Sequence, residues 1–345
     1  MKMHFFKIER RLETMEKNFG KLADGREVRL YTIENGRVRA DITSYGAGLV
    51  SLWVDGVDVC LGCDDVRGYE CNGAYLGAVV GRSANRIGGA GFDLNGERVT
   101  LPANEGKNNL HSGPDSWGWR LWEMTAHTEN SVTLAIHSPH GDQGFPGNAD
   151  VTVTYCIEND GLTITYRGVS DRDTVFNLTN HAYFNLFGQD KPERAMDQEL
   201  MVPGELFCPD DAENIPTGEL RSVEGTPFDF RSFKPIGRDI GMDYEPLHLQ
   251  GGYDHNFVNV EKVAAVMRNP ENGLTMTVTT DCPGIQVYAG NFLDNTGKGG
   301  VYYGKRSGVA LETQFDPTSV NHPEWPQPFV KAGEPWQSVT RYAFE

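Results

Sequence analysis

The sequence predicts an all-β protein built as one large, single-domain antiparallel β-sandwich. From Val28 onward, apolar and polar residues alternate in short runs that end at turn dipeptides, the pattern of strands with one buried face. The 345 residues also include 40 Gly and 18 Pro, and no long apolar stripe recurs at helical period. This composition is typical of many strands joined by loops, as in sandwiches and barrels.

Turn dipeptides between alternating runs predict hairpins along the chain. Asn35-Gly36 divides VRLYTIENGRVRADITSYG, and Asp160-Gly161 divides VTVTYCIENDGLTITYRGVS. Asn-Gly and Asp-Gly favour tight hairpin turns because these residues tolerate positive φ. SVTLAIHSP and MTVTTDCPGIQVYAG have the same alternation, and we expect hairpin strands there as well.

The chain divides into residues 1–20, a polar N-terminal extension, and residues 21–345, the sandwich domain. Residues 8–19 are rich in Glu, Arg and Lys and favour a short polar helix or a frayed extension. No linker or internal repeat interrupts the rest. The stretches 209–219 and 321–336 are rich in proline, which cannot donate to a central ladder, so we expect long surface loops there.

Charge and cysteine content exclude several classes of function. A formal charge of −17, without a basic cluster, disfavours nucleic-acid and membrane partners. Six scattered cysteines indicate a reducing compartment, and the N-terminal apolar patch is too short for an export signal, so we expect a cytoplasmic protein. Cys60 and Cys63 form a C-x-x-C without a second pair, and we expect no metal.

Two windows in the first third of the chain carry candidate binding residues. GRSANRI, residues 81–87, follows an apolar run and offers Arg82, Asn85 and Arg86 as planar donors for sugar hydroxyls or as ordinary ion-pair partners. NNLHSGPDSWGW places His111 among loop formers and aromatic residues. His111 could equally be a pocket residue or a structural histidine.

The segment VFNLTNHAYFNLFG, residues 175–188, places His181 and Tyr183 among Asn177, Asn180 and Asn185 in an otherwise apolar run. Buried polar groups need partners, so this cluster predicts either a satisfied network or a ligand site, and we favour the site.

Three later windows add carboxyl and amide groups. GGYDHNF contains Asp254, PGIQVYAGNFLD contains Gln286, and GVALETQF places Glu312 at the end of an apolar strand. A buried Glu312 would have the raised basicity of a general base, although a solvated strand end is the alternative. Phosphate loops, dinucleotide fingerprints and serine-esterase elbows are absent. The remaining groups suit acid–base chemistry on an uncharged polyol.

In chain order, the blocks GRSANRI, NNLHSG, DQGFPGN, NLTNHAYFNL, GGYDHNF, PGIQVYAGNFLD and ETQFDPTSVNHPEWP closely resemble those of the aldose 1-epimerase (galactose mutarotase) family. The resemblance covers essentially the whole chain after the extension. It implies a β-sandwich of the galactose mutarotase type with the sugar in a cleft across one face. The implied reaction interconverts the α and β anomers of free aldohexoses such as galactose and glucose, without a cofactor.

The resemblance assigns roles to matching positions. It implies that His181 is the general acid to the ring oxygen and that Glu312 is the general base. We expect the pair to start with an ionised carboxylate and a protonated imidazole. The positions implied to bind the sugar are Asn85, Arg86, His111, Tyr183, Asp254 and Gln286.

Two other classes of function remain open. One is a carbohydrate-binding or sensing protein that kept the pocket without the chemistry. The other is an enzyme of the same fold, either a hexose-phosphate epimerase that uses Arg82 and Arg86 or a glycoside-processing enzyme that uses Asp254 and Glu312. In each case the partner is a small sugar, and we expect a monomer or homodimer.

Overall fold

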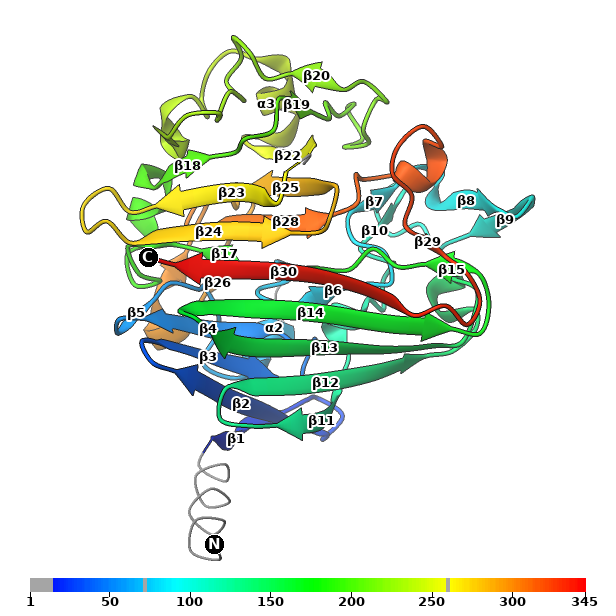
Figure 1. The fold of residues 1–345 in the computed structure, drawn as a ribbon, viewed down its shortest axis with the longest axis horizontal. Coiled ribbons are helices and arrows are strands. Elements are labelled where there is room, and N and C mark those ends of the chain that lie inside the picture. Colours follow the sequence, from blue (N-terminus) through cyan, green and yellow to red (C-terminus); the bar gives the residue numbers. More distant parts are fainter. Residues whose placement is uncertain (1–14, 71–72, 259–260) are drawn as a thin grey trace, which may run out of the picture.

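The computed structural model describes residues 15–70, 73–258 and 261–345. Its strands build two packed layers, and every ladder between its named strands is antiparallel (Figure 1). The prediction of an all-β antiparallel sandwich is therefore confirmed.

One layer is a sheet of nine strands within the described residues. In spatial order these are β11 (Glu123–His127), β12 (Ser131–Ser138), β13 (Ala149–Glu158), β14 (Gly161–Ser170), β30 (Trp336–Phe344), β24 (Thr275–Thr280), β23 (Val263–Arg268), β18 (Glu199–Met201) and β21 (Lys234–Pro235).

The other layer contains two sheets. The described strands of the first are β1 (Glu16–Lys21), β2 (Glu27–Asn35), β3 (Val38–Thr43), β4 (Leu49–Val54) and β5 (Val57–Asp58). Those of the second, in spatial order, are β17 (Tyr183–Phe184), β28 (Val309–Gln314), β25 (Gly284–Tyr288), β22 (Asp254–Val258), β19 (Leu206–Phe207) and β20 (Arg221–Ser222).

Short ladders and helices fill the connections. The paired short strands are β6 (Val79–Val80) with β16 (Thr179–Asn180), β7 (Arg86–Ile87) with β10 (Asn109–Leu110), β8 (Gly91–Leu94) with β9 (Glu97–Thr100), β15 (Thr174–Val175) with β29 (Phe329–Val330), and β26 (Asn295–Thr296) with β27 (Tyr302–Tyr303). The α-helices of the described residues are α2 (Val66–Glu70) and α3 (Glu245–Gln250), and their 3₁₀ turns are η1 (Gly88–Ala90), η2 (Trp117–Trp119), η3 (Asp142–Gly144), η4 (Pro192–Asp197), η5 (Ile236–Arg238), η6 (Lys298–Gly300) and η7 (Ser319–Asn321). None of the helices described is long and apolar enough to span a bilayer.

The largest of three buried hydrophobic clusters in the described residues joins the two layers. Ile33 of β2 and Leu311 of β28 belong to the same buried cluster as Val153 of β13 and Val278 of β24. Because alternate residues of each strand point to opposite faces, the inward positions are apolar and the outward positions are free to be polar.

Two of the predicted hairpins are present, although the turn residues are Gly36-Arg37 rather than Asn35-Gly36 and Asn159-Asp160 rather than Asp160-Gly161. Asn35 pairs with Val38 across the β2–β3 turn. In the β13–β14 hairpin, Glu158 pairs with Gly161, and the turn residues Asn159 and Asp160 both have positive φ, at 47° and 54°. These values suit the tight turn that the right-handed twist of paired strands favours.

The hairpin predicted within MTVTTDCPGIQVYAG is wrong. β24 pairs with β23 and β30, whereas β25 pairs with β22 and β28 in the other layer. The connection Asp281 to Pro283 carries the chain between layers, and Asp281 accepts a hydrogen bond from Val339 N–H on the way. Alternation identifies a strand, but it does not identify the strand's partner.

The predicted extension, residues 1–20, falls mostly outside the described residues. Its last part belongs to β1, in which Gly20 pairs with Val28 of β2. Residues 16–19 are therefore extended rather than helical, because β2 supplies backbone partners for them.

Candidate active site

The outward face of the six-stranded sheet is polar because of the strand period. In β28, Val309 and Leu311 face the core, so Glu312 points to the opposite face. Glu312 pairs in register with Gln286 of β25, and Gln286 pairs with Asn256 of β22. One face of three neighbouring strands therefore presents a row of polar side chains.

His181 is brought to this face by the short segment between β16 and β17. Its N–H donates to Ala78 O at 2.9 Å, and its carbonyl accepts from Gly77 N–H at 3.0 Å. Gly77 has a φ of 66°, and a Cβ there would lie 1.9 Å from Leu49 O. Only glycine allows this close approach, which fixes the backbone that carries His181.

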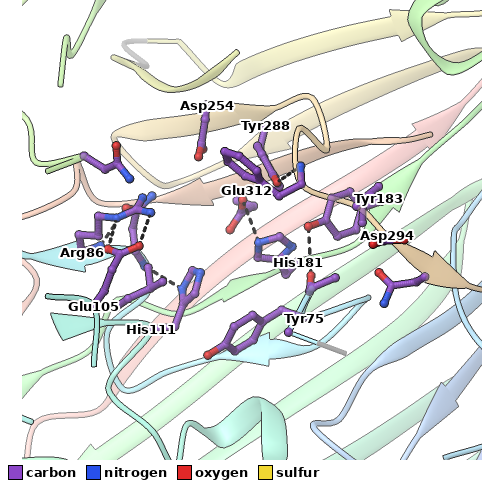
Figure 2. A pocket seen from close by; sticks show the side chains of 18 residues that line it. Tyr75, Arg86, Glu105, His111, His181, Tyr183, Asp254, Tyr288, Asp294 and Glu312 are labelled. Carbon is purple, nitrogen blue, oxygen red and sulfur yellow. Dashed lines mark hydrogen bonds and ion pairs between the residues drawn. The ribbon is translucent and has the colours of Figure 1, made fainter. Parts of the chain in front are cut away.

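Glu312 and His181 face each other at the centre of a cavity of about 610 Å³ (Figure 2). Glu312 Oε1 lies 3.6 Å from His181 Nε2, and the two side chains are only 3% and 7% exposed. The second carboxylate oxygen, Oε2, is buried and makes no hydrogen bond within the described part of the chain. This arrangement leaves Glu312 with an oxygen available for a ligand proton.

Burial changes the protonation of this pair. It lowers the pKa of His181 to about 4, and it raises the pKa of Glu312 well above its ordinary value, with the negative charge of Asp254 adding to the rise. Both shifts favour the neutral carboxyl and the neutral imidazole over the expected ion pair of an ionised carboxylate and a protonated imidazole.

His111 is a neutral hydrogen-bond donor. Its Nδ1 accepts from Asn85 N–H at 3.1 Å, so the ring proton lies on Nε2. Burial, followed by His181 and Arg86, lowers its pKa well below its ordinary value. The rings of His111 and His181 meet edge to face with centroids 5.6 Å apart, and Tyr75 lies 4.7 Å from His111.

Arg86, Glu105 and Asp254 form the side of the cavity beyond His111 (Figure 2). Arg86 donates from Nε to Glu105 Oε2 at 2.6 Å and from Nη2 to Glu105 Oε1 at 2.8 Å. Burial raises the pKa of Asp254, while Arg86 and the Gln286 amide oppose the rise. Donor and acceptor groups at this end are suited to the hydroxyl groups of a sugar.

Seven of the eight predicted site residues line this cavity. They are Asn85, Arg86, His111, His181, Tyr183, Asp254 and Glu312. Tyr183 donates its hydroxyl proton to Ala74 O at 3.0 Å, so its ring and acceptor lone pairs remain for the cavity.

Gln286, the eighth predicted residue, lies behind Asp254 rather than on the cavity wall. Its amide donates to Asp254 Oδ1 at 2.7 Å and accepts from Gln314 Nε2 at 3.3 Å. Gln314 also donates to Asn256, which in turn donates to Asp316. This chain of amides sets which way the Gln286 amide points, and it holds the Asp254 carboxylate in one orientation.

Four further residues of the predicted motifs are structural. The buried Arg82 guanidinium donates to Ser138 Oγ at 2.6 Å and to Pro146 O at 2.6 Å, so it is not a pocket donor. Asn177, Asn180 and Asn185 bond to backbone groups of Phe315, Gly77 and Lys191 respectively. The three asparagines of the cluster thus form a satisfied network, whereas His181 and Tyr183 of the same cluster line the cavity.

Sequence reasoning missed several cavity residues. These are Tyr75, Glu105, Asn214, Tyr288, Phe292, Asp294 and Asn295. Most lie in irregular loops, where no residue period distinguishes an inward side chain from a solvated one. Tyr288 could have been predicted as a site residue, because it lies two positions after Gln286 in the same strand and so on the same face.

Metal-ligating side chains do not cluster in the described structure. Within residues 15–70, 73–258 and 261–345, no three His, Cys, Asp or Glu side chains are arranged to hold a metal ion. Burial raises the pKa of both Cys60 and Cys63 to about 12, which favours thiols over the thiolates that ligate metals.

Comparisons with known proteins find similar sequences over most of the chain. The family model described as aldose 1-epimerase matches residues 29–343. The chain is 39% identical over 336 residues to the aldose 1-epimerase of Escherichia coli K12, covering 93% of this chain and 96% of that protein. It is 38% identical over 328 residues to the galactose mutarotase of Bos taurus, covering 92% and 94%.

Solved structures show the same fold. The GalM/aldose epimerase homologue from C. elegans superposes with a TM-score of 0.84 at 31% identity, covering 92% of this chain and 98% of that one. The galactose 1-epimerase from Lactobacillus acidophilus NCFM also gives a TM-score of 0.84, at 26% identity over 96% and 98% of the two chains.

Proposed function

Because this chain belongs to the aldose 1-epimerase family and is an isomerase, we propose that Glu312 and His181 interconvert the anomers of galactose and glucose. The observation that carries these roles is the buried carboxyl–imidazole pair, 3.6 Å apart at the centre of the cavity. Groups this close can reach two oxygens bonded to the same carbon, as O1 and O5 are in a pyranose.

The reaction follows from the single proton of the pair. In the ion-pair tautomer, Glu312 accepts the proton of the O1 hydroxyl while His181 donates its proton to O5, and the C1–O5 bond breaks. The product is the open-chain aldehyde, which rotates about C1–C2. Closure on the other carbonyl face returns both protons and gives the other anomer.

The charges of the cavity favour a neutral sugar. Among its described lining residues, Arg86 is cationic and is paired with Glu105, whereas Asp254, Asp294 and Glu312 add further carboxyl groups. The Arg82 guanidinium bonds to Ser138 instead of facing the cavity, so the described lining residues include no second arginine that could bind a phosphate. The hexose-phosphate alternative therefore loses its support.

The pH dependence of kcat/KM is expected to be bell-shaped. Activity requires one proton on the pair, so kcat/KM should fall below about pH 4, where His181 is also protonated and no base remains. It should also fall above the raised pKa of Glu312, where both groups are deprotonated and no acid remains. The kcat/KM for galactose measured from pH 3 to 10 checks this, because it reports the groups of the free protein, and a flat profile across both limbs would contradict it.

Replacing Asp254 by asparagine is expected to act through sugar binding. Loss of a charged acceptor should raise KM by about tenfold or more while turnover falls much less. Steady-state polarimetry separates the two constants, and the exposed Asp93→Asn is the matched control. A large loss of turnover at unchanged KM would show that Asp254 acts in the chemical step instead.

The proposed function is tested by the optical rotation of freshly dissolved α-D-galactose and α-D-glucose with and without the protein. Acceleration of both relaxations supports it and ranks the two sugars. Sugar binding without acceleration would favour a binding or sensing protein, and release of an aglycone from a glycoside would favour a glycoside-processing enzyme.

The proposal also includes a cytoplasmic location and a monomer or homodimer. The scattered cysteines support a reducing compartment, since a cytosolic chain keeps such thiols reduced.

A further inference from the structure

Arg86 is the cationic side chain of the described cavity wall, and Glu105 controls how it is presented. The two form a bidentate pair, with contacts of 2.6 and 2.8 Å. The Arg86 side chain is only 12% exposed, whereas that of Glu105 is 33% exposed. The pair uses the Nε–H and one Nη2–H, so three of the five guanidinium N–H bonds remain for a ligand.

Glu105 is itself held by a tight turn. Its N–H donates to Asn108 O, and Asn108 N–H donates to Glu105 O at 2.9 Å. The turn is anchored through Asn108 Oδ1, which accepts from Gly89 N–H at 2.9 Å. Since Gly89 follows β7, which carries Arg86, the turn and the arginine belong to one hydrogen-bonded unit.

An ion pair joins this turn to a second loop. Lys107 Nζ lies 2.9 Å from Glu213 Oε2, and the next residue, Asn214, lines the cavity with a φ of 62°. Asp211 accepts from the N–H groups of Glu213 and Ile215, which stabilises the loop in this form. Glu105, which lies at the end of the cavity farthest from Asp294 in Figure 2, is therefore on a turn that this ion pair joins to the loop of Asn214, another lining residue.

We propose that Glu105 is a positioning residue that holds Arg86 as a fixed, charge-balanced donor and so makes the cavity select neutral aldoses over sugar acids. This inference rests on the proposed function. A bidentate carboxylate fixes the plane of the guanidinium, which lowers the entropy lost when Arg86 binds hydroxyl groups. It also cancels the charge that would otherwise attract an anionic sugar into a cavity of low dielectric constant.

The test compares D-galactose with D-galacturonate, which differs by a carboxylate at C6. In Glu105→Gln we expect KM for galactose to rise by about tenfold, because the charged acceptor of Arg86 is lost, with turnover nearly unchanged. The ratio of KM for galacturonate to KM for galactose should fall by about tenfold. Glu105→Asp restores the charge and should keep the wild-type ratio. The exposed Glu97→Gln is the matched control.

The outcomes separate the two proposals. Active wild-type protein whose ratio does not change in Glu105→Gln would overturn the role of Glu105 and leave the proposed function standing. A rise in KM for galactose would not rescue that role, because such a rise alone indicates only disturbed packing. If the wild type does not accelerate mutarotation, the proposed function fails. The same ratio is then measured as dissociation constants by the change in tryptophan fluorescence on adding each sugar, since the centroid of the Trp119 ring lies 4.2 Å from that of Tyr75, which lines the cavity.

Discussion

Replacing Glu312 by glutamine is expected to lower the turnover of mutarotation by about 10²–10⁴-fold, the usual contribution of a positioned acid or base. The amide has the size of the carboxyl group but cannot accept the O1 proton. Glu312 is buried and its Oε2 bonds no described group, so the substitution breaks no hydrogen bond at that oxygen. KM should change little. Polarimetry at saturating galactose measures the effect, with circular dichroism to establish folding.

Glu97→Gln, which changes an exposed glutamate of β9, is the control for Glu312→Gln and should retain wild-type turnover. A Glu312→Gln protein with wild-type turnover would remove Glu312 from the chemical step. Another carboxyl group of the cavity would then have to be the base. Asp254 would be the first to test, because its pKa is also raised.

Replacing His181 by alanine is expected to cost a similar factor in turnover, because His181 is the imidazole that faces Glu312 at 3.6 Å in the cavity. The double variant Glu312→Gln/His181→Ala should be scarcely slower than either single variant, since the pair shares one proton and acts as a unit. The low-pH limb near pH 4 should also disappear in His181→Ala, because that limb reports the imidazole.

His111→Ala is the comparison for His181, since it removes a second buried imidazole from the same cavity wall. As a neutral Nε2–H donor, His111 should affect sugar binding in the ground and transition states and so raise KM. If His111→Ala lost turnover as fully as His181→Ala at unchanged KM, the assignment of the acid to His181 would be wrong.

Site residues that lie in regular strands can be predicted from the sequence, and those in irregular loops cannot. The orientation of β28 can be predicted from the sequence, because Val309 and Leu311 face the core and Glu312 therefore faces the opposite side. His181 and Tyr183 also follow from an unusual polar residue pattern in an apolar run. Glu105 and Asn214 could not be found this way, because each lies in an irregular loop whose inward direction is set by contacts with another loop.

Fold prediction succeeded and failed for related reasons. Alternation and turn chemistry are local, so they located strands and the β13–β14 turn. Pairing between distant strands is not local. It depends on which surfaces bury each other, and this is why β24 and β25 were assigned to one hairpin although they belong to opposite layers.

The sequence by itself determined the class of fold, the family and the residue types of the site, because strand period and motif order are properties of the chain. Only the tertiary structure decided how those groups behave. Burial between packed elements raises the pKa of Glu312 and lowers that of His181. Neighbours distant in sequence turn Gln286 into a support for Asp254 and pair Arg86 with Glu105. Desolvation and hydrogen-bond geometry depend on the whole environment of a group, which no window of sequence contains.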